Sequence, residues 1–399
     1  MHALLLSLGL SSCGDWLYNV ALLALVYART GSATWVAVTT ATRVLPIVVL
    51  GPLGGAIADR YDRRRLLVIS DLTRAGLMAA LALVAAAGGP IVLAPLLAAL
   101  ATAAGSATPP CVAACTARIV PESDLQRANA IRAGVGQAAI VIGPALGALL
   151  LLAAGPAVAI LLNGLTFLAS ATVLAAISSD ISLAPTRGSD QPLPSLWADI
   201  RAGARALRGT PAAIRLVGAD VICSAVYGLL TVTLVLVGRR AGAGAGAYGL
   251  LLAACGIGGV LGATLVGRIA AANRWRGTLA CALAFVGVSL GLLGTVSGLA
   301  EAIGLALVLG SGMVVGEVLS ETALPRLLGE EVLARAYGLA LPAALGGIVA
   351  GSLSAGPLVS WLGLRGTLVS AGAFVLLSGV WLLRRPLTSA VRPLAAAET

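Results

Sequence analysis

The chain has 399 residues, of which 59% are hydrophobic and 11% are charged, and its mean hydropathy is +1.01. A soluble domain needs a larger polar surface than this, so the composition predicts a protein surrounded mainly by lipid. The net charge of +10 depends on arginine alone, because the sequence contains no lysine. The arginines lie in short loops between apolar runs, which argues against a nucleic-acid partner.

Two features of the composition argue against an enzyme. Without lysine there is no phosphate-binding loop of the Walker type, so the chain is not by itself an ATP-driven pump. His2 is the only histidine, and a Ser-His-Asp triad or a histidine-rich zinc site needs an imidazole held inside a built site. We therefore expect no enzymatic activity, no metal and no other cofactor.

Segmentation at arginines, Gly-Pro turns and charge clusters predicts twelve transmembrane helices, since about 20 apolar residues cross a bilayer. The predicted helices are residues 3–27, 34–58, 66–87, 91–117, 129–153, 156–178, 213–237, 247–267, 277–297, 301–323, 337–361 and 364–383. The expected fold is an all-α membrane protein in which these helices form two pseudo-symmetric six-helix bundles.

The predicted domains follow from this segmentation. Residues 1–178 form the first bundle, 213–385 form the second, and 386–399 form a tail. Between the bundles, the linker 179–212 contains apolar residues at helical spacing around Trp197, opposite arginines. This pattern predicts an amphipathic helix in the membrane interface, which tethers the two bundles or regulates them.

The distribution of arginine predicts the orientation in the membrane. With both termini in the cytoplasm, twenty arginines lie in the inward loops and tail, and four lie on the outward side. Because cytoplasmic loops carry the excess of positive charge, we expect a multi-pass protein of the cytoplasmic (inner) membrane with both termini inside.

The sequence aligns with itself at an offset of 208 residues without gaps. This offset pairs Gly54 with Gly262, Arg60 with Arg268, Glu122 with Glu330, Arg127 with Arg335 and Gly143 with Gly351. We interpret the alignment as a parallel repeat of six helices, an arrangement in which two bundles rock about a central site.

The loop after the second predicted helix, residues 54–65, matches the pattern Gly-x-x-x-Asp-Arg-x-Gly-Arg-Arg. The matching residues are Gly55, Asp59, Arg60, Arg63 and Arg64, and Asp62 replaces the second glycine. In this loop the chain resembles the major facilitator superfamily. An aspartate at a helix end accepts hydrogen bonds from a helix N-terminus and from arginines, so we expect a latch that holds the inner faces together.

The fifth predicted helix contains Gly143, Pro144 and Gly147, which are similar to part of a motif associated with antiporters of that superfamily. The resemblance implies export rather than import. A structural explanation also fits, because a proline with flanking glycines bends a helix and lets a neighbour pack closely.

Further short segments resemble one branch of the superfamily, the macrolide-efflux proteins and the enterobactin exporter, also called transmembrane secretion effectors. They are Gly14-Asp15-Trp16, Thr30-Gly31-Ser32-Ala33, Arg43-x-x-Pro46 and Leu125-x-x-Ala128-Asn129. The resemblance implies a secondary-active, proton-driven exporter of a medium-sized, partly hydrophobic compound such as a drug, an antibiotic or a siderophore.

Ionisable groups inside predicted helices are expensive in lipid and therefore mark candidate functional sites. Asp15, Arg43 and Asp220 are the candidates for proton coupling, and Asp15 is expected either to carry the proton beside Arg43 or to form a static pair with it. Asp71 and Arg74 are three residues apart and predict a local ion pair. The predicted walls of the substrate cavity are Ser12, Asn19, Ser224, Tyr227, Thr231 and Glu317.

The sequence therefore predicts an antiporter that works by alternating access as a monomer. Its expected partners are a small-molecule substrate, protons and the lipid bilayer. Two alternatives remain: a proton-coupled importer of a small nutrient, or a channel or lipid scramblase, since polar stripes would also line a pore.

Overall fold

The computed structural model describes residues 2–176, 211–242, 246–269, 275–327 and 330–384, and these residues form helices and their connections, without a strand. The predicted linker helix around Trp197 and the tail 386–399 lie outside the described residues. A chain in lipid must satisfy its backbone polar groups internally, and the α-helix does so within each segment.

The helices follow one another with short connections. They are α1 (His2–Thr30), α2 (Ala33–Arg60), α3 (Arg63–Ala86), α4 (Leu93–Ala104), α5 (Thr108–Ile119), the 3-10 helix η1 (Glu122–Asp124), α6 (Leu125–Ala175), α8 (Pro211–Arg240), α9 (Ala247–Ile269), α10 (Trp275–Leu293), α11 (Leu299–Leu327) and α12 (Glu330–Arg384). Side-chain caps begin two of them: Ser32 accepts a hydrogen bond from the Trp35 amide before α2, and Asp62 accepts one from the Arg65 amide before α3.

Nine helical stretches of the described chain are long and apolar enough to cross a membrane. Two of them are double-length, because α6 and α12 each contain two helices joined at a glycine with positive φ, Gly155 at 80° and Gly363 at 67°. Only glycine adopts this conformation without strain. The fourth predicted helix is bent, since α4 and α5 together form one stretch from Leu93 to Ile119 that is interrupted before Pro109.

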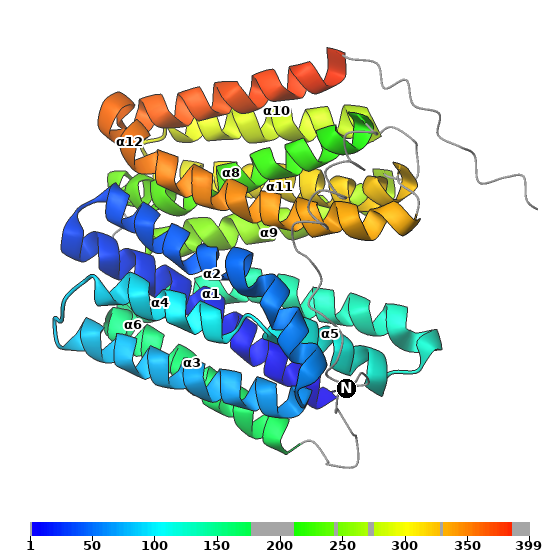
Figure 1. The fold of residues 1–399 in the computed structure, drawn as a ribbon. Helices are drawn as coiled ribbons and strands as arrows, with labels where there is room; N and C mark the ends of the chain where they lie inside the picture. The colour runs from blue at the N-terminus through cyan, green and yellow to red at the C-terminus, as the bar shows by residue number, and fades with distance from the viewer. Residues whose placement is uncertain (1, 177–210, 243–245, 270–274, 328–329, 385–399) are drawn as a thin grey trace, which may run out of the picture.

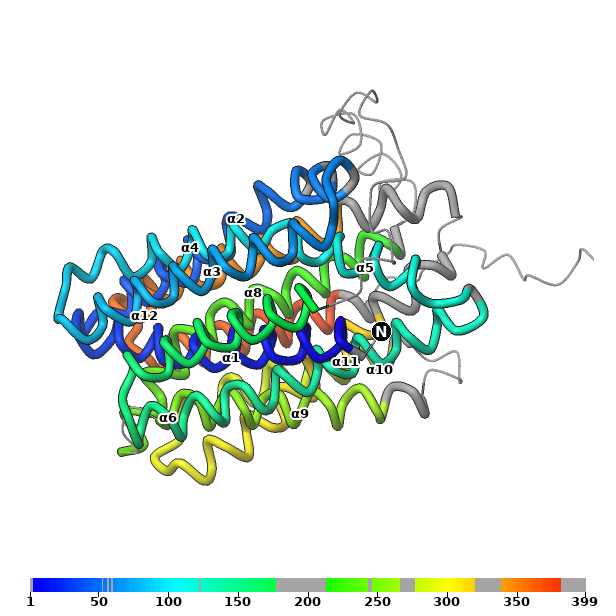
Figure 2. Tube along the Cα trace, turned by 90° about the horizontal axis from the view of Figure 1, so that it is seen from below, coloured from blue at the N-terminus to red at the C-terminus, as the bar shows by residue number. Residues whose placement is uncertain are grey.

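The helices form two groups that pack mainly among themselves (Figure 1). One group is α1–α6, and the other is α8–α12; α2 contacts α12 and α6 contacts α9 across the boundary. Figure 2 shows that the helices of both groups run in one general direction between two end faces. We call the end at which α1 begins and α2 ends the N-terminal face, and the other end the opposite face.

The two groups repeat the same close helix crossing. A Cβ at Gly143 of α6 would lie 2.9 Å from the carbonyl oxygen of Cys13 in α1, and a Cβ at Gly351 of α12 would overlap the carbonyl of Ala225 in α8. Gly143 and Gly351 are paired by the 208-residue offset, and the residues they meet correspond within one helical turn. Backbones approach this closely only where side chains are small.

Contacts between the two groups gather toward the opposite face. The guanidinium of Arg239, at the end of α8, lies 5.2 Å from the ring centre of Tyr27 in α1. A Cβ at Gly356 of α12 would lie 2.7 Å from the hydroxyl oxygen of Thr34, at the start of α2. The two groups are therefore in contact at this end.

The outer surface is apolar, as expected for contact with lipid. Large hydrophobic side chains remain exposed along the helices, among them Trp361 at 85%, Leu377 at 69% and Leu83 at 67%. In water a surface of this kind would drive association. Together with the apolar helices, it agrees with a multi-pass membrane protein.

Candidate functional site

A cavity of about 550 Å³ lies where the two helix groups meet. Most of its described lining comes from α8, α9, α11 and the first part of α12. Trp16 of α1 and Gln137 and Ile140 of α6 complete it from the first group. Along α8 the lining runs from Leu216 to Leu234, and most of the wall is apolar. A mainly apolar pocket with a few polar groups is typical of small-molecule sites.

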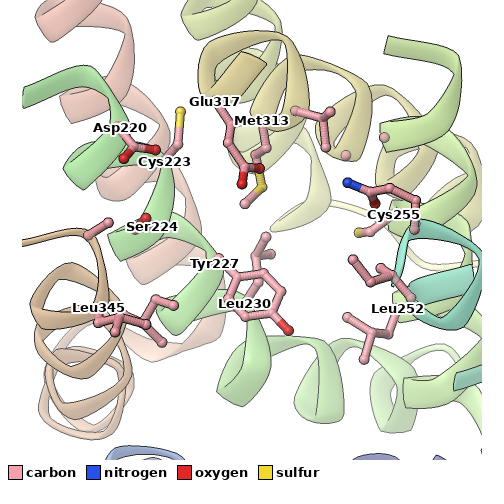
Figure 3. Close-up of a pocket in the computed structure, with 18 of the residues that line it drawn as sticks. Asp220, Cys223, Ser224, Tyr227, Leu230, Leu252, Cys255, Met313, Glu317 and Leu345 are labelled. Carbon is pink, nitrogen blue, oxygen red and sulfur yellow. The ribbon is translucent and has the colours of Figure 1, made fainter. Parts of the chain in front are cut away.

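Four of the predicted cavity and coupling residues line this space: Asp220, Ser224, Tyr227 and Glu317. Figure 3 shows the side chains of Asp220 and Glu317 at one end of the cavity, with Tyr227 farther along it. The Tyr227 ring meets the Trp16 ring edge to face, with 6.4 Å between ring centres, so an aromatic pair bridges the two helix groups.

Ser12, Asn19 and Thr231 are not part of the lining of this cavity. Asn19 is 1% exposed and Thr231 is 2% exposed, so both are enclosed by neighbouring helices. The Thr231 hydroxyl donates a hydrogen bond of 2.7 Å to the Gly228 carbonyl in its own helix. The predicted polar side chains of α8 therefore line the cavity in part, whereas the predicted polar side chains of α1, Ser12 and Asn19, do not line it.

The expected ion pair between Asp15 and Arg43 is wrong in this structure. Asp15 instead pairs with Arg74 of α3, with 2.6 Å between Asp15 Oδ2 and Arg74 Nη2. Arg43 of α2 lies over the ring of Tyr18, with its guanidinium carbon 5.8 Å from the ring centre. The physical reason is packing: Asp15 and Tyr18 are neighbours on one face of α1, and the way α3 and α2 pack there brings Arg74 to the carboxylate and Arg43 to the ring.

Arg74 is the centre of a network inside the first helix group. Its guanidinium lies 3.9 Å from the ring centre of Phe167 in α6, and its Nη1 is 3.8 Å from Oδ1 of Asp71. The Ser170 hydroxyl donates to Asp71 Oδ2 at 2.5 Å. The predicted Asp71–Arg74 pair is confirmed, and Arg74 also joins α3 to α1 through Asp15.

Two arginines of the latch loop donate hydrogen bonds to backbone carbonyls. Arg63 Nε donates to the Ala58 carbonyl at 3.2 Å, and Arg64 Nε donates to the Leu174 carbonyl at 3.2 Å. A second Arg64 nitrogen, Nη2, donates to the Ala175 carbonyl. Arg64 therefore caps the C-terminal end of α6, where the last carbonyls lack helical partners and the helix dipole favours a cation.

The remaining latch residues are Arg60, Gly55 and Asp59. The Arg60 side chain is exposed, and nothing lies within 4 Å of a Cβ at Gly55. The Asp59 side chain lies outside the described part. Asp62, which breaks the sequence pattern, is the N-cap of α3, and sequence reasoning assigned it no role. The neighbouring Gly54 is the close-packed glycine, since a Cβ there would be 2.5 Å from the Ser106 carbonyl oxygen.

The helix-five motif contacts helices on two sides. Gly143 and Gly147 lie against carbonyls of α1. Pro144 has no N–H, so the Ile140 carbonyl one turn earlier loses its helical hydrogen bond. Gly256 of α9 lies at that carbonyl, because a Cβ there would be 3.0 Å from the Ile140 oxygen. The motif thus packs against both helix groups, which a single sequence could not indicate.

Among the described residues, no group of three or more His, Cys, Asp or Glu side chains could hold a metal ion. The site has the lining of a binding cavity. Its charged residues and aromatic rings can bind a ligand, and the glycine contacts beside it allow helices to move against each other.

The corrected ion pair predicts different effects for two arginines. Replacing Arg74 by methionine leaves the buried Asp71 and the Asp15 carboxylate without their cation, so we expect the free energy of unfolding to fall by about 2 kcal/mol. The Arg43→Met variant removes a cation that lies over the Tyr18 ring, and we expect its free energy of unfolding to fall by about 0.5 kcal/mol. Thermal unfolding of both purified variants in detergent measures this difference. An equal loss in the two variants would contradict the assigned pairing.

Comparison of the sequence with known proteins finds transporters among its relatives. The chain is 26% identical over 272 residues to an uncharacterised transporter of the major facilitator type, YfiS of Bacillus subtilis, covering 67% of this chain and 64% of that protein. It is 29% identical over 177 residues to the multidrug efflux pump Tap of Mycobacterium tuberculosis, covering 42% of each. The matched regions thus span less than two thirds of either relative.

Solved structures of transporters share the fold. The D323A mutant of the nucleoside transporter NupG superposes with a TM-score of 0.79 at 11% identity, over 95% of this chain and 98% of that chain. A bacterial homologue of the human lysosomal transporter Spinster, in an inward-facing conformation, gives 0.74 at 13% identity, over 95% of each.

The family assignment rests on a match that covers most of the chain. The family model described as transmembrane secretion effector matches residues 2–396. The family and the relatives matched by sequence are transporters and not enzymes. The chain belongs to the transmembrane secretion effector family of major facilitator transporters.

Proposed function

We propose that the protein is a proton-coupled exporter of a medium-sized, partly hydrophobic compound and works by alternating access as a monomer. The observation that carries this proposal is the position of the cavity between the two helix groups. A site shared by two groups can change its exposure when they rock against each other.

The membrane arrangement we propose has twelve passes. The α4–α5 pair forms one pass, α6 and α12 form two each, and the other helices form one each. This arrangement places the turns at Gly155 and Gly363 on the face opposite the N-terminus, and Figure 1 shows the turn of α12 at the end away from the N-terminus. The arginine distribution supports a cytoplasmic N-terminal face.

Reporter fusions test this arrangement. Alkaline phosphatase fused after Gly155 or Gly363 should be active, because the enzyme works only outside the cytoplasm, and a fusion after Pro121 should be inactive. Activity is measured in intact bacterial cells and corrected for the amount of each fusion. An inactive fusion at Gly155 together with an active one at Pro121 would contradict the proposed orientation.

Two features support export as the direction. The helix-five residues, which resemble an antiporter motif, pack against α9 at the edge of the cavity. The relative Tap is named as an efflux pump. By their titles, the solved structures with similar folds include a nucleoside transporter and a POT family transporter in complex with a conjugated peptide, so the fold itself does not determine the substrate.

For proton coupling we propose the Asp15–Arg74 pair. The Asp15 side chain is 36% exposed, whereas Arg74 is 11% exposed, so water reaches the carboxylate more readily than the guanidinium. Protonation of Asp15 would end its attraction to Arg74, which then keeps Asp71 as its partner. A switch of this kind loosens α1 from α3 when a proton enters. Each charge moved through the membrane potential contributes about 2.3 kcal/mol per 100 mV.

Everted vesicles test the coupling. In vesicles acidified inside, entry of a transported compound should drive protons out and so reduce the pH gradient. The rate of this proton release should saturate as the concentration of the compound rises. The compounds are a panel of partly hydrophobic antibiotics and dyes, and a pH-sensitive dye reports the gradient. The Asp15→Asn variant should lose this response while retaining exchange of labelled compound for unlabelled compound. Undiminished proton release by this variant would exclude Asp15 as the coupling residue, and proton release without saturation or exchange would favour a channel.

The latch residues are proposed to stabilise the state in which the N-terminal face is closed. Arg64 fastens the start of α3 to the end of α6 through two charged donors. We expect Arg64→Ala to lower the rate of transport about tenfold, since one charge-assisted hydrogen bond contributes about 1.5 kcal/mol.

Arg65→Ala is the matched control for the latch. Arg65 is the next residue, its side chain is exposed, and its backbone amide keeps the bond to Asp62 in the variant. Transport is measured in the same vesicles at equal amounts of protein. Equal rates for Arg64→Ala and the unaltered protein would refute the role of Arg64.

A further inference from the structure

Arg43 of α2 lies at the boundary between the two helix groups and takes no part in the Arg74 network. Its guanidinium lies over the Tyr18 ring, and no carboxylate of the described residues forms a salt bridge with it. The hydroxyls of Tyr227 in α8 and Tyr248 in α9 are also close enough to interact with its charge. A cation inside a membrane helix is costly, and an opposite charge is the partner that best offsets its desolvation.

Three buried polar groups near Arg43 have no hydrogen-bond partner in the described structure. They are the hydroxyls of Tyr227 and Tyr248 and the side-chain nitrogen Nδ2 of Asn19. Asn19 lies beside Tyr248, and these two residues are 1% and 2% exposed. Each of the three groups can donate a hydrogen bond, and leaving them all unpaired destabilises the protein. We call Arg43, Asn19, Tyr227 and Tyr248 the donor cluster.

The donor cluster adjoins one end of the cavity. Tyr227 and Cys255 line the cavity, and Cys255 is close to the hydroxyls of both Tyr227 and Tyr248. Figure 3 shows the Tyr227 hydroxyl on the side of its ring that faces away from Asp220 and Glu317. Those two carboxylates lie toward the other end and have interactions of their own. A ligand at the Tyr227 end therefore meets a hydrogen-bond donor with a positive charge beyond it.

Both helix groups contribute to the donor cluster. Asn19 and Arg43 belong to α1 and α2, whereas Tyr227 and Tyr248 belong to α8 and α9. The cluster is assembled in this structure, in which the groups are in contact at the opposite face. Separation of the groups at that face would carry Arg43 away from the two tyrosines. A ligand held by the cluster would thereby lose part of its binding, which suits release at the opposite face.

We infer that the donor cluster binds a carboxylate of the substrate, and that the transported compounds are organic acids with an apolar body. The Tyr227 hydroxyl donates to the carboxylate and the Arg43 charge attracts it, while the apolar body packs against Trp16 and Leu252, which also line the cavity. This inference rests on the proposed function, to which it adds the substrate class.

The chemistry of the cluster favours a carboxylate over other ligand groups. A carboxylate accepts several hydrogen bonds and supplies the opposite charge that Arg43 lacks among the described residues. One guanidinium balances its single charge, whereas a phosphate monoester carries nearly two. In apolar surroundings the attraction between the two charges is stronger than in water. The cavity volume of about 550 Å³ fits a drug-sized acid.

Three pyrene derivatives of similar size test the inference. Pyrenebutyrate carries a carboxylate, pyrenebutanol is neutral and pyrenebutylamine is a cation. Binding to the purified full chain in detergent is measured by equilibrium dialysis, with protein-free micelles subtracted. The carboxylate should bind saturably at one site, and the alcohol and the amine should bind about tenfold more weakly. Because this comparison uses the unaltered protein, it does not depend on whether any variant folds.

An arginine variant then locates the binding. Arg43→Met should weaken pyrenebutyrate binding about tenfold and leave pyrenebutanol binding unchanged, because only the charged ligand loses a partner. Arg215→Met is the matched control, since the Arg215 guanidinium also lies over an aromatic ring, 5.9 Å from the ring centre of Trp381, and Arg215 does not line the cavity. This control should bind pyrenebutyrate as tightly as the unaltered protein.

Two further measurements place the ligand at the Tyr227 end. Tyr227→Phe removes one hydroxyl and keeps the ring, so pyrenebutyrate binding should weaken about threefold while pyrenebutanol binding changes less. Tyr27→Phe is its control, because Tyr27 also lies beside an arginine at the group boundary but does not line the cavity. Bound pyrenebutyrate should slow alkylation of Cys255 and leave the exposed Cys281 unaffected.

Three results would overturn the inference: binding of the alcohol or the amine as tight as that of the carboxylate, unchanged carboxylate affinity in Arg43→Met, or an equal loss in Arg215→Met. The binding experiment has no membrane and no gradient, so it is independent of export and of proton coupling. Carboxylate binding at Arg43 without uphill transport would refute the proposed function alone. Uphill export of neutral or cationic compounds without carboxylate binding would refute this inference alone.

Discussion

Close contact between helix backbones is the constraint on which the rest of this structure depends. In lipid the hydrophobic effect does not draw helices together, so association relies on van der Waals packing that small residues permit. The 50 glycines of the chain supply those positions. At Gly143 against Cys13, at Gly351 against Ala225 and at Gly258 against Leu307, a Cβ would meet the carbonyl of a neighbouring helix. These contacts fix the positions of the helices from which Trp16, Tyr227 and Asp220 reach the cavity.

The same close packing determines how charge is accommodated inside the protein. Arg74 lies where α1, α3 and α6 meet, with carboxylates on two sides and the Phe167 ring beneath it. A charge in this position is tolerated because its partners offset the free-energy cost of desolvating it. When one partner is removed, that desolvation cost is no longer offset. Asp220 and Glu317 lie elsewhere, in the lining of the cavity. The Arg74 network and the cavity are thus separate parts of the molecule.

The boundary between the two helix groups joins these features. Pro144 frees a carbonyl at Ile140, Gly256 of α9 packs against it, and both Ile140 and Gly256 also line the cavity. Movement of one group against the other would therefore change the cavity wall directly. The contacts of Arg239 with Tyr27 and of Gly356 with Thr34 lie farther toward the opposite face, and they would have to separate for the cavity to open there.

The sequence by itself determined the helical membrane fold, the local Asp71–Arg74 pair and the repeat that relates Gly143 to Gly351. These features depend on hydropathy, on spacing along one helix or on similarity within the chain, all of which are local or linear. Only the tertiary structure decided that Asp15 meets Arg74 rather than Arg43, and that Asp220, Ser224, Tyr227 and Glu317 share a cavity while Asn19 and Thr231 are enclosed. Helical periodicity shows which residues share a face, but the rotation of each helix against its neighbours determines what that face meets.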